Sequence, residues 1–429
     1  MFSTNDNNDL VKNTSHKVVL PFYLYAALSF LLATVLLFFS ADAFTQHYFH
    51  PHTLAITHCM ALGWGTMIIL GASHQLIPVL IEGRLYSNAL AYLSFLFSAT
   101  GIPLLLYGFY FFNMGWPVQW GGLLINVSIV CYVVNLAISM GKSKKENVHA
   151  VFVFTAGLWL LLTTLAGLLL ACNFTAALLP KGSLHYLPLH AHMGIIGWFL
   201  LLVTGVGSRL LPMFLISKYS NTKMLWFIYF FINGGLILFV ILFIYFPIDN
   251  LYMLPLAAIL FAIILFVMYS YKSFKQRIRK QVDEPMKLSL FSVIMMVIPM
   301  MVLAAIIIWC MFYAINARLV LLYGFVIFFG WITAIIFGMT FKTLPFIVWN
   351  KEYHLKAGLG KTPNPKDLFN NLLFKIMTIV YLMGFILFTT GIYMGNILMI
   401  QVAALFLISA AVLYNWNVLK MLMHKSKPS

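Results

Sequence analysis

Two apolar stretches of the chain contain histidines, which membrane helices rarely carry without a functional reason. Residues 57–80 read THCMALGWGTMIILGASHQLIPVL and include His58 and His74, and residues 191–214 read AHMGIIGWFLLLVTGVGSRLLPMF and include His192. Neutral imidazole is the most common metal ligand of proteins and a common axial ligand of haem iron. These residue types therefore predict a metal or haem site near one face of a membrane.

Most of the other histidines gather near the same predicted face. We expect His58 and His192 to be ligands, because polar groups buried in a bilayer are costly and usually functional. His190 and His52 are further candidate ligands beside them. The alternative for the loop histidines is that they only hydrogen-bond neighbouring groups at the membrane surface. The seven histidines at this face are His47, His50, His52, His58, His185, His190 and His192.

His74 lies on the same stretch as His58 but cannot share a metal with it. The two residues are 16 positions apart, which is about 24 Å along a helix. We place His74 near the opposite, inner face, together with the cations Arg209 and Lys342. These cations are expected to reach the membrane boundary or lipid phosphate, and Arg209 is also a candidate for binding an acidic ligand.

The composition assigns all these residues to a membrane protein. Of the 429 residues, 62% are hydrophobic and only 8% are charged, against about a quarter charged in soluble proteins. The net charge of +16 is spread over short basic clusters between apolar runs, as in loops facing anionic lipid. The expected partner is therefore the lipid bilayer and not nucleic acid. The four cysteines lack CxxC spacing, so neither a disulfide framework nor a thiolate metal site is predicted.

The elements that position the histidines are twelve apolar runs of about 20 residues, the length of a membrane-spanning helix. The runs lack the strict alternation of barrel strands, so an all-α polytopic fold is predicted. Cations concentrate in alternate loops, and the positive-inside rule then places both termini in the cytoplasm. The second, sixth and tenth helices therefore run inward from the outer face. The expected helices begin near Val18, Thr53, Asn88, Gly121, Ala150, Pro188, Met224, Leu251, Leu288, Arg318, Asn371 and Asn396.

These three helices also contain an internal repeat. A tryptophan preceded by glycine is followed at fixed spacing by a glycine and a proline, and 134 and 133 residues separate successive copies. His58 and His192 occupy the same repeat position, where the third copy has Phe325. The repeat predicts three pseudo-symmetric four-helix units, 18–148, 149–287 and 288–429, after a cytoplasmic tail 1–17. The repeated residues are Trp64, Gly71 and Pro78; Trp198, Gly205 and Pro212; and Trp331, Gly338 and Pro345.

The architecture resembles subunit I of the haem-copper oxidase superfamily, which includes cytochrome oxidases and nitric oxide reductases. In that family a histidine of helix 2 ligates the low-spin haem, which corresponds to His58. A histidine of helix 6 ligates the copper or other non-haem metal, which corresponds to His192. The resemblance implies a b-type haem, copper or both as cofactors. It also implies an electron donor or a respiratory partner subunit, and a place in the bacterial cytoplasmic membrane.

Other motifs of that family are missing from this sequence. The seventh helix has no adjacent histidine pair, and the tenth has no His-x-His, so the usual binuclear centre cannot be assembled. If the chain is an enzyme, the resemblance implies an oxidoreductase that lacks this centre. The segment from His58 through Gly63 and Gly71 to Pro78 also resembles the NnrS-type haem-copper membrane proteins, although their Gly-His-Thr-Gly-Arg segment is absent.

Two functions are compatible with these features. The first is a redox protein that binds haem or copper through outer-side histidines of helices 2 and 6, for electron transfer or for handling of nitric oxide or oxygen. The second is a non-redox transporter or accessory protein on the same scaffold, with Arg209 and Lys342 as its inner gate. All ten acidic residues fall in loops, tails or helix ends, which argues against proton-coupled transport.

Overall fold

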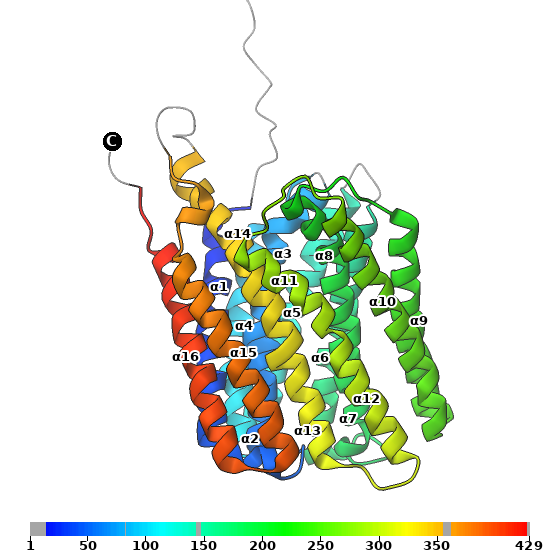
Figure 1. Ribbon diagram of the computed structural model, residues 1–429. Coiled ribbons are helices and arrows are strands. Elements are labelled where there is room, and N and C mark those ends of the chain that lie inside the picture. Colours follow the sequence, from blue (N-terminus) through cyan, green and yellow to red (C-terminus); the bar gives the residue numbers. More distant parts are fainter. Residues whose placement is uncertain (1–13, 82, 143–146, 355–361, 427–429) are drawn as a thin grey trace, which may run out of the picture.

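The computed structural model describes residues 14–81, 83–142, 147–354 and 362–426. Within these ranges the protein contains twelve helical spans that are long and apolar enough to cross a membrane, and no β-strand (Figure 1). The predicted all-α, polytopic class is therefore confirmed, and the chain is a multi-pass membrane protein. Most of the tail predicted for residues 1–17 lies outside the described residues.

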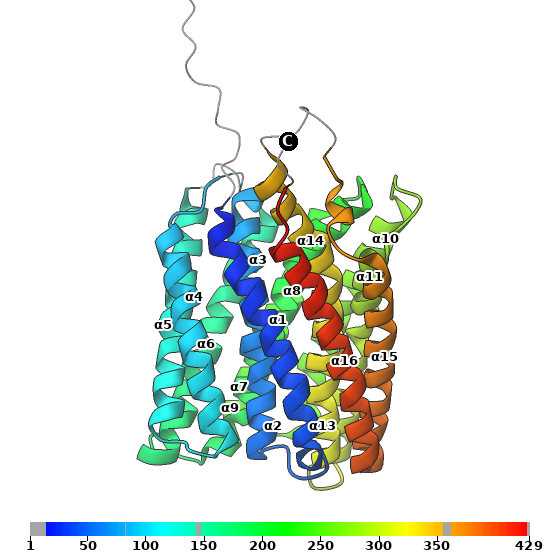
Figure 2. The ribbon, with the colours of Figure 1, turned by 90° about the vertical axis from the view of Figure 1, so that its left-hand side faces the viewer.

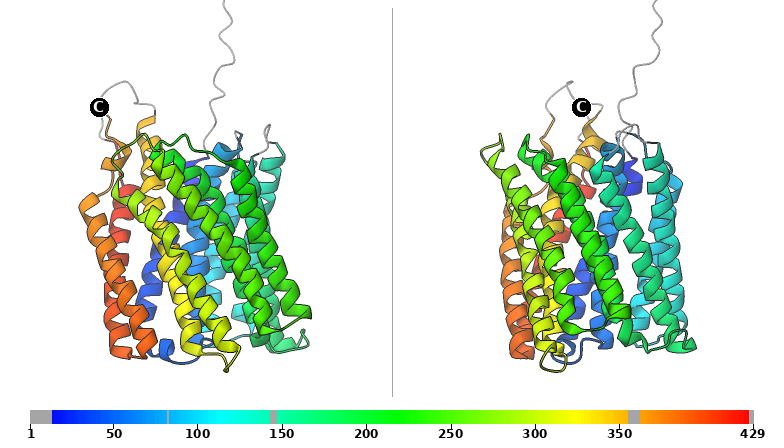
Figure 3. Two further views of the ribbon diagram at one scale, coloured as in Figure 1. Left: turned by 45° about the vertical axis from the view of Figure 1, so that its right-hand side comes forward. Right: turned by 90° about the vertical axis from the view of Figure 1, so that its right-hand side faces the viewer.

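Nine spans form the outside of the bundle. For all twelve spans, the predicted start lies within five residues of the observed one. Figure 3 shows α9 and α10 on this outer surface. The outer helices are α1 (His16–Phe39), α4 (Asn88–Tyr110), α5 (Trp116–Gly141), α6 (Val148–Ala176), α9 (Thr222–Tyr245), α10 (Met253–Lys275), α11 and α12 (Glu284–Met295 and Val297–Cys310), α15 (Asn371–Met394) and α16 (Ile397–Leu422). Short 3₁₀ turns are η1 (Ala41–Thr45), η4 (Asp249–Tyr252) and η7 (Pro365–Asp367).

The other three spans form the centre, and each contains a π-helical segment between two α-helices. In their most apolar stretch 78% of residues are buried, against 50% or less in the outer spans. The π segments begin directly after His58, His192 and Phe325. The three spans are α2, η2 and α3 (Pro51–His58, Cys59–Thr66, Met67–Leu80); α7, η3 and α8 (Ser183–His192, Met193–Leu200, Leu201–Leu215); and α13, η5 and α14 (Ala317–Phe325, Val326–Ile332, Thr333–Tyr353).

The repeated glycines bring each central span close to the helix before it. A Cβ atom on Gly71 would lie 2.6 Å from Cβ of Phe22 on α1. A Cβ on Gly205 would clash in the same way with Phe152 on α6, and one on Gly338 with Ser289 on α11. Only glycine allows backbones to approach this closely. The first two spans of each repeat therefore pack as a pair.

The bundle closes where α1 packs against α16, the two ends of the described chain (Figure 2). The even number of spans places the start of α1 and the end of α16 at one end of the bundle. We call this end the basic face, because it carries Lys142, Lys218 and Lys351. The opposite end, with His47 and His185, is called the histidine face.

The repeated tryptophans link the central spans through hydrogen bonds. Trp64 donates its indole N–H to Thr333 Oγ1, and Trp198 donates to Thr66 Oγ1, both at 3.1 Å. Each acceptor is two residues after the tryptophan of another repeat. The same rule gives Leu200 as the partner of Trp331, but the leucine side chain has no atom that can accept a hydrogen bond. Accordingly, Trp331 Nε1 is buried without a hydrogen-bond partner.

We predict that Leu200→Thr supplies the missing acceptor. A buried N–H without a partner is destabilising by about 1–3 kcal/mol. Leu200→Val is the matched control, because valine has the shape of threonine without the hydroxyl. The free energy of unfolding of the threonine variant should be about 1 kcal/mol higher than that of the valine variant. Thermal or denaturant unfolding followed by tryptophan fluorescence measures this difference. The gain should vanish when Trp331→Phe is also present, and a less stable threonine variant would contradict the predicted bond.

Candidate functional site

A large cavity lies between the central spans in the half of the bundle nearer the histidine face. Its volume is about 400 Å³, and residues of α4, α5, α6 and α12 complete its wall. The lining is mostly apolar, yet His58, His190 and His192 all border it. Three of the four candidate ligands therefore border one cavity within the membrane-spanning region.

Each of the three imidazoles is held by a backbone carbonyl. Nδ1 of His58 lies 2.8 Å from the carbonyl oxygen of Leu54, and Nδ1 of His192 lies 2.7 Å from that of Pro188. Nδ1 of His190 lies 3.0 Å from the carbonyl oxygen of Thr163 on α6. Because a carbonyl oxygen only accepts, Nδ1 carries the proton and donates it. Nε2 of each ring is then left with its lone pair, the form that ligates a metal.

The His58 ring on α2 and the His190 ring on α7 lie near each other at the border of the cavity. Their ring centres are 6.3 Å apart, and the ring planes differ by 18°. A metal bound by two imidazoles on opposite sides has metal–nitrogen bonds of about 2 Å, which puts the ring centres about 6 Å apart. The separation of the ring centres therefore matches the separation expected for two imidazoles that hold one metal between them.

His192 is not the partner of His58 in this pair, although the repeat predicts His192 as a ligand. His190 and His192 are two residues apart on α7, which turns their side chains about 200° apart around the helix. Nε2 of His192 instead accepts a hydrogen bond from the Tyr323 hydroxyl at 3.3 Å, and its ring contacts Phe239. The repeat favours His192 over His190 as a ligand, because only His192 shares the repeat position of His58.

The two pairs are equivalent under the repeat. His58 and His192 share one repeat position, and His190 and Tyr323 share the position two residues earlier. His192 and Tyr323 accordingly have ring centres 5.8 Å apart and planes 25° apart, close to the geometry of His58 with His190. The third such combination is Phe325 with Ile56, both buried. The scaffold thus provides one imidazole pair, one imidazole–phenol pair and one apolar pair.

Gly167 on α6 makes room for the His190 ring. A Cβ atom at this position would lie 2.8 Å from Cε1 of His190, which is closer than carbon atoms approach. On the other side, the His58 ring packs against Phe109 at 4.5 Å between ring centres. The position of each imidazole is therefore set by packing as well as by its Nδ1 bond.

His50, the N-cap residue of α2, and His52 in its first turn are held at the histidine face by local contacts. The His52 ring stacks on Tyr110 with centres 4.1 Å apart, and its Nδ1 is buried without a partner. His50 Nδ1 accepts the backbone N–H of His52. Burial, and then the neighbouring His52, lower the pKa of His50 below its usual range. In the part of the chain that the structure describes, no group of three or more His, Cys, Asp or Glu side chains is placed to hold a metal ion.

The residues assigned to the inner side lie near the basic face. His74 is fully buried against Phe22 and Tyr132. Lys342 lies 2.6 Å from a carboxylate oxygen of Asp283, so its charge is neutralised by an ion pair. Arg209 is exposed on the surface of α8. This ion pair does not favour Lys342 as a free gating cation of a transporter.

Comparison with known proteins gives no match: no family model and no curated protein matches this chain. The resemblance to the haem-copper oxidase superfamily therefore stays a prediction from the sequence. The function of the chain has to be inferred from the geometry of its cavity.

Proposed function

We propose that this chain is a membrane redox protein that binds a b-type haem between His58 and His190. The observation that carries the proposal is this pair of near-parallel imidazoles, 6.3 Å apart, each with Nδ1 bonded to a carbonyl. The proposal keeps the predicted ligation by helices 2 and 6, with His190 in place of His192. It is consistent with a divergent relative of the haem-copper oxidases.

The cavity fits a haem better than a bare metal ion. A porphyrin itself supplies four nitrogen ligands, so two imidazoles are sufficient, whereas a protein site for copper or zinc needs three or four side chains. The mostly apolar wall suits the flat face of a porphyrin, and drug-sized ligands occupy cavities of about 300–1,000 Å³. Among the described residues, His192 with Tyr323 offers copper only one imidazole.

The ligand pair favours electron transfer over gas binding at the same iron. A haem bound in this way supplies reversible one-electron transfer. His58 on α2 and His190 on α7 would hold the haem through Nε2 of both rings, which disfavours binding of nitric oxide or oxygen at the same iron. The task of these residues is then to hold the cofactor rigidly and away from water.

The position of the site indicates where an electron donor would act. His58 lies at the end of α2, eight residues into a span that starts at the histidine face. An electron donor or respiratory partner subunit would therefore approach this face. The basic residues at the opposite face support a cytoplasmic location for that side. The bacterial inner membrane is the location that the resemblance to the haem-copper oxidases implies.

The first test is the absorption spectrum of the full chain purified from haem-replete cells. We expect a six-coordinate, low-spin haem spectrum in the wild-type protein. His58→Ala and His190→Ala should each remove this spectrum, because each leaves one axial position empty. His192→Ala should keep it, and so should His185→Ala, the matched control on the same helix.

Two results would refute the assignment. Colourless protein from such cells would exclude the haem itself. Loss of the spectrum in His192→Ala, with retention in His190→Ala, would return the axial role to His192.

A second prediction concerns the packing of His190. Gly167→Ala should displace the imidazole, because the added methyl would lie 2.8 Å from Cε1. We expect about tenfold weaker haem retention, the scale found when groups that orient a ligand are changed. Gly122→Ala is the matched control, since it adds a methyl to the same cavity beside the flexible end of Leu168. Equal retention in the two variants, measured by haem titration of the apoprotein, would contradict this role of Gly167.

A further inference from the structure

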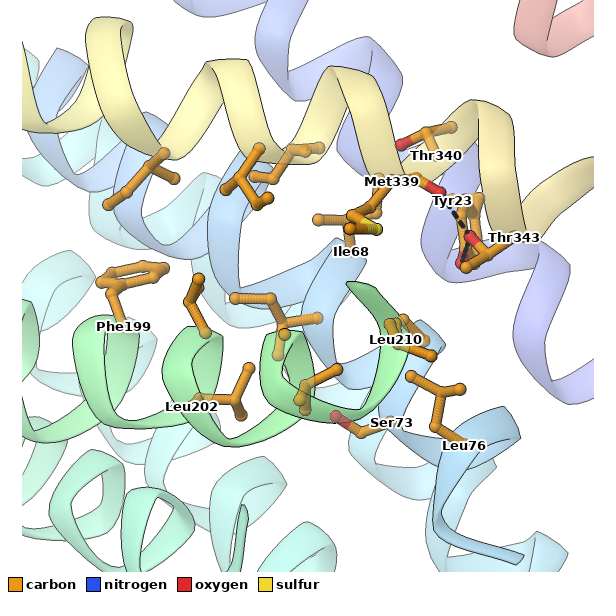
Figure 4. Close-up of a pocket in the computed structure, with 18 residues that line it drawn as sticks. Tyr23, Ile68, Ser73, Leu76, Phe199, Leu202, Leu210, Met339, Thr340 and Thr343 are labelled. Carbon is orange, nitrogen blue, oxygen red and sulfur yellow. Dashed lines mark hydrogen bonds between the residues drawn. The ribbon is translucent and has the colours of Figure 1, made fainter. Parts of the chain in front are cut away.

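A second cavity lies between the three central spans, nearer the basic face (Figure 4). Its volume is about 100 Å³, and α3, α8 and α14 form most of its wall. Residues at equivalent repeat positions line it, so the cavity follows the pseudo-threefold axis of the bundle. Two such triplets are Ile68, Leu202 and Ile335, and Ala72, Val206 and Met339.

This second cavity is almost wholly apolar. Four hydroxyl groups line it, those of Tyr23, Ser73, Thr340 and Thr343, and three of them are bonded to other protein groups. The Tyr23 hydroxyl lies 3.0 Å from Thr343 Oγ1 (Figure 4). Thr340 Oγ1 lies 3.1 Å from the Tyr414 hydroxyl. Water needs two to four polar partners to occupy a cavity, and apolar cavities of about 150 Å³ stay dry and take up xenon or benzene. The wall of this cavity therefore suits a small apolar molecule.

Phe199 separates this second cavity, the axial cavity, from the larger cavity that His58, His190 and His192 border, which we call the histidine cavity. It is the only residue that lines both, among those described. Its ring lies against Gly65, where a Cβ atom would be 2.7 Å from Cε1, and it meets Phe328 edge-on at 6.0 Å. A change in the rotamer of one side chain would thus connect the two spaces.

We propose that the axial cavity binds a small apolar molecule of the size of a diatomic gas, which enters from the histidine cavity past Phe199. The triplets of aliphatic side chains provide the contact surface, and Phe199 forms the boundary with the larger cavity. The site needs no metal and no haem. It is therefore independent of the function proposed for His58 and His190.

Xenon is the probe for this site. We expect ¹²⁹Xe saturation-transfer NMR of the full chain in phosphatidylcholine nanodiscs to give a bound-xenon signal distinct from that of xenon in lipid. Ala72→Leu and Val206→Leu, on different helices, should each remove this signal by filling the cavity. Met339→Ala should increase it by enlarging the cavity. Leu162→Phe, which adds bulk on the lipid-facing side of α6, should leave it unchanged.

The variants move the signal in both directions, so a fault in folding cannot imitate the expected pattern. Absence of a bound signal in the wild-type chain, or the same signal in all three cavity variants, would overturn the site. Phe199→Ala should accelerate exchange between bound and free xenon. An unchanged exchange rate in this variant would overturn the proposed route of access.

Discussion

The bond from a histidine Nδ1–H to a backbone carbonyl is the interaction on which the candidate site depends. In the bilayer interior an imidazole has no water to satisfy it, so a hydrogen bond to a protein group stabilises the ring. For His58, His190 and His192 that partner is a carbonyl oxygen within 3.0 Å. The bond fixes the tautomer and turns the basic nitrogen away from the helix backbone. Without it, burial would favour an apolar residue, as at Phe325.

Three copies of one packing arrangement surround this site, and the differences between the copies carry its chemistry. Glycines bring the central helices close to their neighbours, and π segments begin at the same repeat position in all three. Polar side chains interrupt this symmetry at only a few places. The combination of His58 with His190 occurs once, and its equivalents are a His–Tyr pair and an apolar pair. A scaffold held together by apolar packing can therefore diversify its ligand positions without losing its fold.

The sequence alone was sufficient for the class, the twelve spans and the clustering of histidines at one face. The length of an apolar run and the spacing of its residues are local properties. The helix starts predicted from them therefore differ from the observed starts by only a few residues. The π segments were not predicted, because their wider turns arise from packing at the centre and leave no simple composition signal. The sequence named His58, His190 and His192 as candidate ligands but could not single out the pairing of His58 with His190. This pairing depends on the rotation of α7 about its axis and on the space left by Gly167, a glycine more than 20 residues away in the chain.

The hydrogen bonds of the tryptophans between the repeats have a consequence for the synthesis and membrane insertion of the protein. Trp64 and its acceptor Thr333 are separated by 269 residues. At a synthesis rate of about 5–20 residues per second, the ribosome needs on the order of half a minute to cover that distance. During this interval the indole of the second span has entered the bilayer before its acceptor exists. The glycine contacts within each repeat form early, whereas the ring of central helices can close only when the tenth span has been delivered by the insertion machinery.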